Sequence, residues 1–369
     1  MLKTFKVRGY RTFKNFELSN LSRVNVFVGK NNAGKSSLLE AIYLYGERCD
    51  SDVFRRIASK RGEMARDLGD GEFLPEISHF FLGHEFKTSS SFVLGGDEDK
   101  YKVDVLEEKR GSSDHFFPLP VRGMLSNEGV LGLRVQKTMA ANKWRTIQNL
   151  PVTARGILLD RFARFPRSKS SLAVRDMRFI SPDILDYQLL AKMWNHIITL
   201  GKEGEVVEAL KILTPKVNAV QFLLTELDNY KYAPKSSAGI VVGLQGTAMR
   251  VPLGSLGDGM RRLLGIAMAL LCVEKGALYI DEIDVGFHYS IMQNIWEFVL
   301  AMAQRTNIQV FISTHSLDCL KGLSAVCAKD SETAKQISLY ALHSPDEDAT
   351  QYSGSEVVTA IRNEIEVRS

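Results

Sequence analysis

One stretch of eight residues has the composition and spacing of a phosphate-binding loop. Residues 29–36 read GKNNAGKS, which satisfies GxxxxGK[ST] between a strand-like and a helix-like stretch. The glycines let the backbone curl so that its N–H groups surround a phosphate, and the following helix N-terminus adds positive potential. A chance glycine-rich turn is the alternative, which the flanking strand and helix disfavour. The residues expected to contact a nucleotide here are Asn31, Asn32, Gly34, Lys35 at the β- and γ-phosphates, Ser36 and, at the α-phosphate, Ser37.

Two later apolar stretches end in side chains that can act on a bound phosphate. The stretch 278–280 is followed by Asp281 and Glu282, and the stretch 311–313 leads to His315. Asp281 is expected to hold Mg²⁺ together with the Ser36 hydroxyl, and Glu282 to polarise an attacking water. His315 would touch the γ-phosphate and orient that water. A histidine at a strand end is usually structural, but the order of the three segments favours catalysis.

These side chains need a scaffold in which strands and helices alternate. Such alternation is typical of a largely parallel α/β core, here interrupted by a strand-rich insertion from 92 to 135 and followed by a hairpin at 239–252. We expect strands at 2–7, 24–28, 277–280, 309–313 and 337–342, and helices at 34–45, 185–199, 203–224, 260–273, 290–303 and 355–365.

The charge of the chain is unevenly distributed. The formal net charge is +4 over 369 residues, but the segment 134–178 holds 11 basic residues and two acids. A local positive field attracts polyanions, so the segment is a candidate site for DNA or RNA. The alternatives are a solvated face, or arginines that pair with acids elsewhere in the fold.

Composition excludes several other classes of protein. The four cysteines form no CxxC pair and no metal-ligand spacing, which argues against a zinc site and against a disulfide framework. The longest apolar run, 263–273, has 11 residues, whereas a membrane span needs about 20. We therefore expect a cytoplasmic protein with no membrane partner.

The segment 255–262, SLGDGMRR, lies immediately before an apolar helix-like stretch. The order of the motifs resembles that of the ABC-type ATPases: a phosphate loop, a glycine-rich signature, a strand that ends in Asp-Glu, and a strand that ends in a histidine. The loop form resembles the branch that contains the SMC, RecF and OLD (overcoming lysogenization defect) ATPase heads. Residues 7–13, VRGYRTF, are similar to the N-terminal segment of that branch, which implies that Arg11 lies near the nucleotide. The resemblance covers residues 1–45 and 240–320.

The signature departs from the usual Leu-Ser-Gly-Gly-Gln. Gly257 stands where the signature serine is expected, and Ser255, two residues earlier, is the alternative. A Gly-Asp-Gly form resembles the small OLD-like ATPases of bacterial anti-phage systems, including the ATPase subunit of PARIS. By this resemblance the nucleotide on one subunit would contact the signature of the other, at Ser255, Gly257, Asp258 and Gly259. The candidates for a Q-loop glutamine are Gln136, Gln148 and Gln188.

The resemblance implies an ABC-type P-loop head with a mixed β-sheet and a compact helical and β-strand insertion in place of a long coiled coil. Residues 1–90 and 236–369 would form the head, and residues 91–235 the insertion lobe. The implied activity is ATP hydrolysis with Mg²⁺ in a homodimer, or in a higher oligomer of dimers. The chain would then act as a sensor switch for a separate effector in anti-phage defence, a toxin or TOPRIM-like nuclease encoded nearby. The alternative is a RecF- or SMC-like DNA-binding ATPase of genome maintenance.

Overall fold

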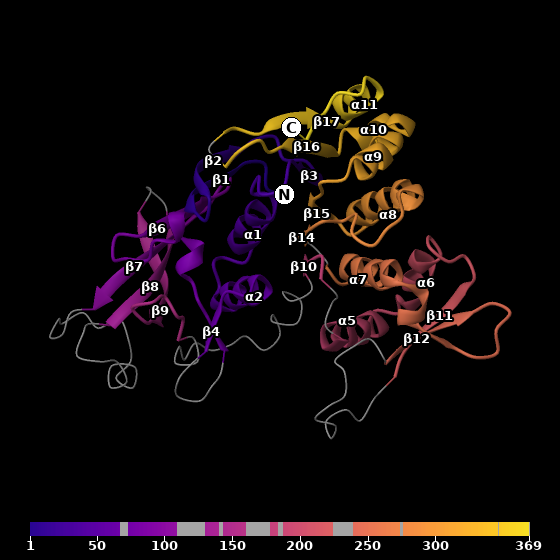
Figure 1. Cartoon of the computed structure of the whole chain (residues 1–369), viewed down its shortest axis with the longest axis horizontal. Helices are drawn as coiled ribbons and strands as arrows, with labels where there is room; N and C mark the ends of the chain where they lie inside the picture. Colours follow the sequence, from indigo (N-terminus) through magenta and orange to yellow (C-terminus); the bar gives the residue numbers. More distant parts are fainter. Residues whose placement is uncertain are drawn as a thin grey trace.

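The computed structural model describes residues 1–66, 73–108, 130–139, 143–159, 178–183, 187–223, 239–273, 276–345 and 347–368. Two six-stranded β-sheets, two smaller sheets and a set of helices make up this part of the chain (Figure 1). The arginine-rich stretch 160–177, which supplies much of the predicted basic segment, lies outside the described residues.

A six-stranded sheet at the centre of the molecule is parallel except at one edge. Its order is β10-β14-β15-β3-β16-β17, and only β17 runs antiparallel to its neighbour. Because layers cover both faces of a parallel sheet, its inner strands are apolar throughout, and every residue of β3 and β15 is buried. The strands are β3 (Val24–Val28), β10 (Phe179–Ile180), β14 (Gly276–Ile280), β15 (Ile308–Ser313), β16 (Ile337–Ala341) and β17 (Thr350–Ser353).

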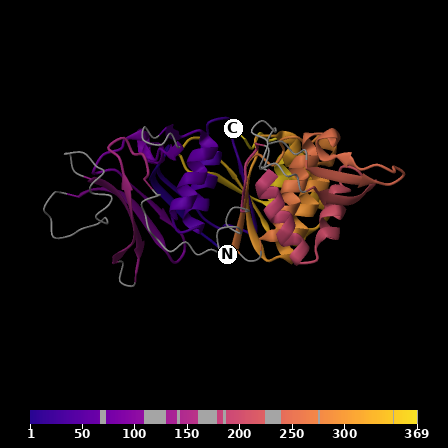
Figure 2. The same cartoon turned by 90° about the horizontal axis from the view of Figure 1, so that it is seen from below.

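Helices cover one face of this sheet, and α1 lies against the other (Figure 2). The first group is α7 (Asp258–Cys272), α8 (Met292–Arg305), α9 (Leu317–Lys329), α10 (Ser331–Ala334) and α11 (Gly354–Arg362), while α1 spans Lys35–Gly46 and is followed by α2 (Ser51–Arg61). Of the first group, α7, α8 and α11 lie against β14, β15 and β16 through buried apolar side chains.

A second, antiparallel sheet lies beyond α1, in the order β2-β1-β6-β7-β8-β9. The N-terminal strands therefore continue directly into the strands of the insertion, and the predicted boundary at residue 90 falls inside one sheet. The strands are β1 (Phe5–Tyr10), β2 (Phe13–Leu18), β6 (Ser91–Gly95), β7 (Lys100–Glu108), β8 (Val130–Thr138) and β9 (Trp144–Val152), with β4 (Met64–Arg66) and β5 (Phe73–Pro75) pairing separately.

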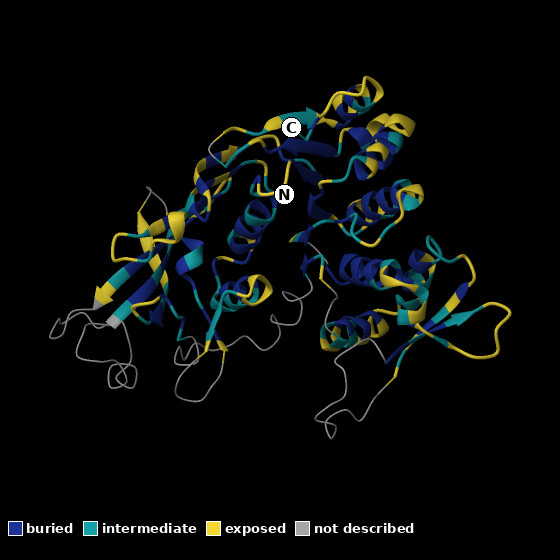
Figure 3. Cartoon of the chain, in the orientation of Figure 1, coloured by how far each residue is buried: buried dark blue, intermediate teal, exposed yellow. Residues whose placement is uncertain are grey.

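The two faces of the central sheet carry different side chains. Phe27, Tyr279 and Phe311 belong to the core beneath α1 and the outer sheet, and the ring centroids of Tyr279 and Phe311 are 5.6 Å apart. Their neighbours Val26 and Ile280 belong to the aliphatic core under α7 and α8. Successive residues of a strand point to opposite faces, so each inner strand contributes side chains to both cores. Figure 3 shows the central strands as buried.

A helical lobe packs beside α7 and corrects one expectation. Residues 203–224 were expected to be helical, but α6 ends at Leu210 and the chain turns at Pro215 into a strand, β11. Residues of β11 pair antiparallel with β12, as Val220 does with Val242, and this pairing requires an extended strand instead of a helix. The elements of this lobe are α5 (Tyr187–Thr199), α6 (Glu203–Leu210), β11 (Val217–Phe222), β12 (Ile240–Leu244) and β13 (Val251–Pro252).

The predicted fold class is confirmed, since the chain forms an α/β structure with mixed strand directions around a P-loop. The expected strand 24–28 is observed with the same bounds. Among the residues that the structure describes, no helix has the length and apolar character that crossing a membrane requires.

The aromatic layer predicts a sharp stability difference between two phenylalanines. Phe311 is 1% exposed and stacks on Tyr279, whereas Phe73 is 61% exposed. Phe311→Ala should lower the free energy of unfolding by about 3–5 kcal/mol because it leaves a cavity, and Phe73→Ala should change it by less than about 0.5 kcal/mol. Urea denaturation measures both. A loss below about 1 kcal/mol at Phe311 would contradict this core assignment.

Candidate active site

The functional segments meet because parallel strands end at one edge of the sheet. In the register, Ser313 of β15 pairs with Phe27 of β3, and Ile312 pairs with Ile280 of β14. The residues that follow these strands therefore emerge side by side. Open α/β sheets bind ligands at this edge.

The lysine of the loop 29–36 donates hydrogen bonds to main-chain carbonyls at the start of the same loop. Lys35 Nζ donates to the carbonyl oxygens of Gly29 (2.8 Å) and Lys30 (2.7 Å). Gly34 stands at φ +91°, and a Cβ there would lie 2.8 Å from the Phe13 ring, so a side chain would be strained and crowded. Burial lowers the pKa of the Lys35 ammonium, and the acids of the neighbouring strand end oppose that shift.

Asp281 connects the loop with two strands. Its Oδ1 accepts from Ser36 Oγ at 3.0 Å and from Ser313 Oγ at 2.5 Å. Mg²⁺ prefers oxygen ligands at about 2.0–2.1 Å in octahedral geometry, so adjacent ligand oxygens lie about 2.9 Å apart. The Ser36 and Asp281 oxygens have this spacing and this chemistry, and they could hold Mg²⁺ together with water and phosphate oxygens.

Glu282 and His315 lie next to each other at the rim of the site. Glu282 adopts φ +49°, a left-handed conformation uncommon for residues other than glycine, and its N–H donates to Ser313 Oγ at 2.8 Å. Its Oε1 is 3.9 Å from His315 Nδ1, and both side chains are partly exposed. A carboxylate and an imidazole so placed can share a water and hand a proton between them.

The strand β10 brings an unexpected segment to the same edge. Phe179 and Ile180 pair in parallel with β14, so Ser181 comes next to the acidic strand end. The candidate Q-loop glutamines lie on three different elements. Gln136 is in β8, Gln148 is in β9, and Gln188 is in the first turn of α5.

The predicted signature forms the start of α7. Gly257, at φ +90°, precedes the helix, and no side chain caps the first turn. Ser255, Gly257 and Asp258 are exposed, whereas Gly259 is half-buried. Among the described residues, no hydrogen bond or ion pair joins these four residues to the loop 29–36 of the same chain. An uncapped helix N-terminus facing solvent can receive an anion from outside the subunit.

Arg262, which the sequence did not single out, lies buried behind this signature. Its Nη2 donates to the carbonyl oxygens of Asp281 (2.6 Å) and Glu282 (3.1 Å), and its Nη1 donates to the carbonyl oxygen of Ser181. A guanidinium that binds main-chain carbonyls leaves no trace in local sequence patterns, so only the fold reveals it.

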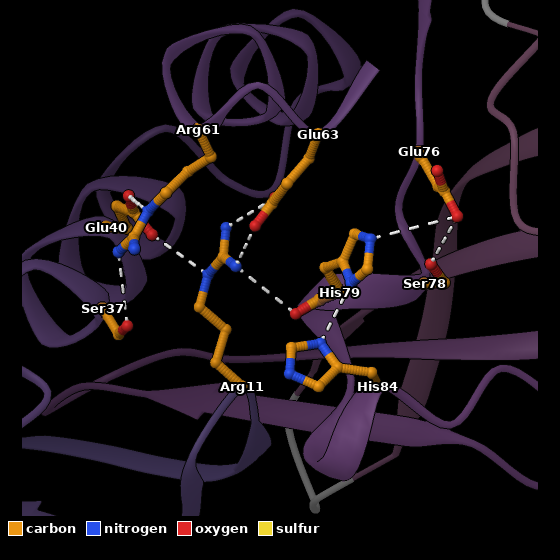
Figure 4. Close-up of polar contacts among 9 residues, drawn as sticks. All are labelled: Arg11, Ser37, Glu40, Arg61, Glu63, Glu76, Ser78, His79 and His84. Atoms are coloured by element: carbon orange, nitrogen blue, oxygen red, sulfur yellow. Dashed lines mark hydrogen bonds and ion pairs between the residues drawn. The ribbon is translucent and has the colours of Figure 1, made fainter. Parts of the chain in front are cut away.

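Arg11 belongs to a buried charge cluster rather than to the loop (Figure 4). Its guanidinium pairs with Glu63 at 2.6 Å and with Glu40 at 3.0 Å. Arg61 lies on the far side of Glu40 and donates to Ser37 Oγ at 3.4 Å. Among the contacts of the described residues, none joins Arg11 to residues 29–36. Arg61 therefore contacts the residue that directly follows the phosphate loop.

Part of the basic segment is neutralised within the fold. Arg134 pairs with Asp104 at 2.5 Å, Lys137 with Asp99 at 2.8 Å, and Arg178 with Glu47 at 2.8 Å. These three basic residues therefore pair with acids that are distant in the sequence, which was one of the alternatives to a site for DNA or RNA. The exposed basic residues that the structure describes in this segment are Lys143, Arg145 and Arg155.

Two family models match separate parts of the chain. A model for an "AAA ATPase domain" matches residues 1–118. A model for an "AAA domain, putative AbiEii toxin, Type IV TA system" matches residues 205–318. Both matched stretches are similar to models of AAA-type ATPase domains, and both extend into the predicted insertion, residues 91–235.

Curated relatives and solved structures are also similar to parts or the whole of the chain. The "ATP/GTP phosphatase" of Helicobacter pylori (strain ATCC 700392 / 26695) is 22% identical over 364 residues, 94% of either chain. The RecF protein of Macrococcus caseolyticus is 34% identical over 112 residues, which are 30% of this chain and 27% of RecF. The SMC head domain of Thermotoga maritima is 13% identical with a TM-score of 0.42, covering 95% of this chain and 98% of that one. A Smc head from Pyrococcus furiosus is 10% identical with a TM-score of 0.47, covering 99% of both chains.

The cluster around Arg11 predicts a separation of stability from nucleotide affinity. Arg11→Met removes the cation between Glu40 and Glu63 and should lower the free energy of unfolding by about 3–5 kcal/mol, as expected when a buried ion pair loses one partner. Thermal or urea denaturation measures this loss. Affinity for ATP, measured with the folded variant, should stay within about twofold. Wild-type stability with a tenfold loss of affinity would instead make Arg11 a nucleotide ligand.

Proposed function

We propose that this protein is a Mg²⁺-dependent ATPase whose site is built from the loop 29–36 and the strand ends of β14 and β15. The observation that carries the proposal is the convergence on Asp281 Oδ1, where a hydroxyl from the phosphate loop and a hydroxyl from β15 meet. The low-identity relative from Helicobacter pylori, an "ATP/GTP phosphatase", supports the same activity.

In the proposed reaction each residue has a distinct task. Lys35 exchanges its two carbonyl partners for β- and γ-phosphate oxygens and supplies a positive charge to them. Ser36 and Asp281 hold Mg²⁺, which when bound neutralises charge on the phosphate oxygens. Glu282 accepts a proton from the attacking water, and the neighbouring His315 orients that water. Asn31, Asn32 and Gly34 offer loop N–H groups, and Ser37 contacts the α-phosphate.

The signature supports a composite site between two copies of the chain. Ser255, Gly257, Asp258 and Gly259 lie at an exposed helix start without a contact to their own loop among the described residues. In the proposed homodimer this helix start faces the γ-phosphate held by the other subunit. Hydrolysis then requires two subunits, and ATP governs whether they stay together.

We further propose that this ATP-driven dimer, or an oligomer of such dimers, acts as a switch for a separate effector in anti-phage defence. The Gly-Asp-Gly signature and the match of residues 205–318 to a model whose description includes a toxin–antitoxin system support this role. The effector would be a toxin or a TOPRIM-like nuclease encoded nearby. Identification of proteins that co-purify with the tagged chain and its operon neighbours tests the role directly.

A RecF- or SMC-like role in genome maintenance is the second candidate. The local match to RecF, 34% over 112 residues, favours it. In either role, Lys143, Arg145 and Arg155 are exposed cations that can contact DNA or RNA. Nucleic-acid binding that weakens steeply with salt would support this contact, because each neutralised phosphate releases counterions.

Removal of the loop lysine tests ATP binding. Lys35→Ala should abolish ATP binding or turnover, because the backbone groups alone leave the phosphate charge uncompensated. Lys321→Ala, a change at an exposed lysine that pairs with Asp318, is the control and should be neutral. Calorimetric binding of ATP with Mg²⁺ and phosphate release measure the two. Unchanged turnover in Lys35→Ala would exclude this loop as the site.

Removal of one carboxylate charge separates binding from chemistry. Glu282→Gln should keep ATP affinity and lower turnover by about 10²- to 10⁴-fold, the usual contribution of a positioned acid–base group. The ATP-bound dimer should then accumulate, as size-exclusion chromatography with light scattering measures. Glu332→Gln, at an exposed helix position, is the matched control. Normal turnover in Glu282→Gln, or undiminished specific activity of a diluted monomer, would contradict the composite site.

A further inference from the structure

Arg262 joins the signature helix to the catalytic strand end by three hydrogen bonds to main-chain carbonyls. The carbonyls are those of Ser181 at the end of β10 and of Asp281 and Glu282 after β14. The side chain is only 7% exposed. One guanidinium thus fixes the backbone that carries both the Mg²⁺-holding aspartate and the proposed general base.

The guanidinium of Arg262 remains charged although it is buried. Burial lowers the pKa of Arg262 to about 10, and the acids around it oppose that shift, so it stays protonated at neutral pH. A planar guanidinium with donors in a rigid fork can bind several carbonyls at once, which a lysine ammonium does less well. The acids that face it are Asp183, Asp281, Glu282 and Asp284.

A second contact reinforces the connection on the other side of the turn. A Cβ placed on Gly259 would lie 2.5 Å from the carbonyl oxygen of Gly286. The start of α7 therefore lies directly against residue 286, while Arg262 holds residues 281 and 282. Thr314 Oγ1 donates to Asp284 between these two points, at 2.5 Å. The signature and the catalytic turn 281–286 are thus packed as one unit.

We propose that Arg262 is a positioning residue that transmits engagement of the signature to the catalytic turn of the same subunit. This inference rests on the proposed function, since it assumes that the signature meets the nucleotide of a second copy. A displacement of α7 on that contact moves the guanidinium and with it the carbonyls of Asp281 and Glu282. Each subunit then aligns Glu282 with its own ATP only when its signature contacts the nucleotide of the other subunit. The two sites of the dimer therefore hydrolyse ATP together.

The test uses full-length variants that differ in charge and geometry. Arg262→Met removes the charge and the donors, and Arg262→Lys keeps the charge without the fork. Arg23→Met is the matched control, because Arg23 also donates to main-chain carbonyls, those of Ala303 and Ile308. ATP affinity, ATP-dependent dimer fraction, turnover at saturating ATP and thermal stability are measured for each folded variant.

Arg262→Met should bind ATP and dimerise within about twofold of wild type and lose about 10- to 100-fold in turnover, as small misplacements of catalytic groups do. Arg262→Lys should recover part of that loss. In the Glu282→Gln background, Arg262→Met should lower turnover by less than about twofold more, because both changes act through one group. Arg23→Met should keep turnover even where its stability falls.

Three outcomes would overturn the assignment. Turnover of Arg262→Met within about twofold of an active wild type would remove Arg262 from catalysis, and if that variant does not fold, the same result for Arg262→Lys decides. Equal losses of ATP affinity and turnover would show a merely structural role. A full further loss in the Glu282→Gln background would show that Arg262 acts independently of Glu282. A wild-type chain that neither binds nor hydrolyses ATP would instead refute the proposed function itself.

Discussion

The candidate active site depends on one carboxylate oxygen. Oδ1 of Asp281 accepts hydrogen bonds from Ser36 on the phosphate loop and from Ser313 on the neighbouring strand. Ser313 in turn accepts from the N–H of Glu282. Because three separate segments meet at these bonds, the positions of the loop, of the proposed Mg²⁺ ligand and of the proposed base depend on one another. A displacement of any one of them therefore shifts the others.

The layered core holds the strand ends of the site in fixed positions. The parallel strands that end at the site are buried on both faces, by aromatic side chains toward α1 and by aliphatic ones toward α7 and α8. Close packing on both sides leaves little freedom to shift a strand end. The exposed functional parts, the signature and the rim pair Glu282 and His315, lie where this packing stops. Contacts with a nucleotide and a second copy would complete the site there.

Local patterns in the sequence predict the parts of this arrangement that depend on neighbours along the chain. The motif 29–36, the strand 24–28 and the acidic strand end all follow from residue type and spacing within about ten residues. Chain order alone predicts that Asp281 and His315 approach the loop, because parallel strands end together. The error at 217–222 arises where a distant strand, β12, outweighs weak helix propensity.

Long-range polar contacts could not be predicted in the same way. Arg262 and Arg261 are adjacent and identical in type, yet Arg262 is the one that donates to the carbonyls of Ser181 and Asp281, which follow β10 and β14. The pairing of Arg178 with Glu47 joins residues 131 positions apart, and it converts an expected free cation into a structural one. Such contacts depend on the finished fold and carry no signal of their own in one sequence.

The most direct test of the central claim is a crystal structure with a non-hydrolysable ATP analogue and Mn²⁺, in which anomalous scattering locates the metal. We predict a metal that is bound by Ser36 Oγ and by the Asp281 carboxylate, with the γ-phosphate between Glu282 and the signature of a second copy. A nucleotide bound away from the loop 29–36, or a metal coordinated without Ser36 and Asp281, would contradict the account.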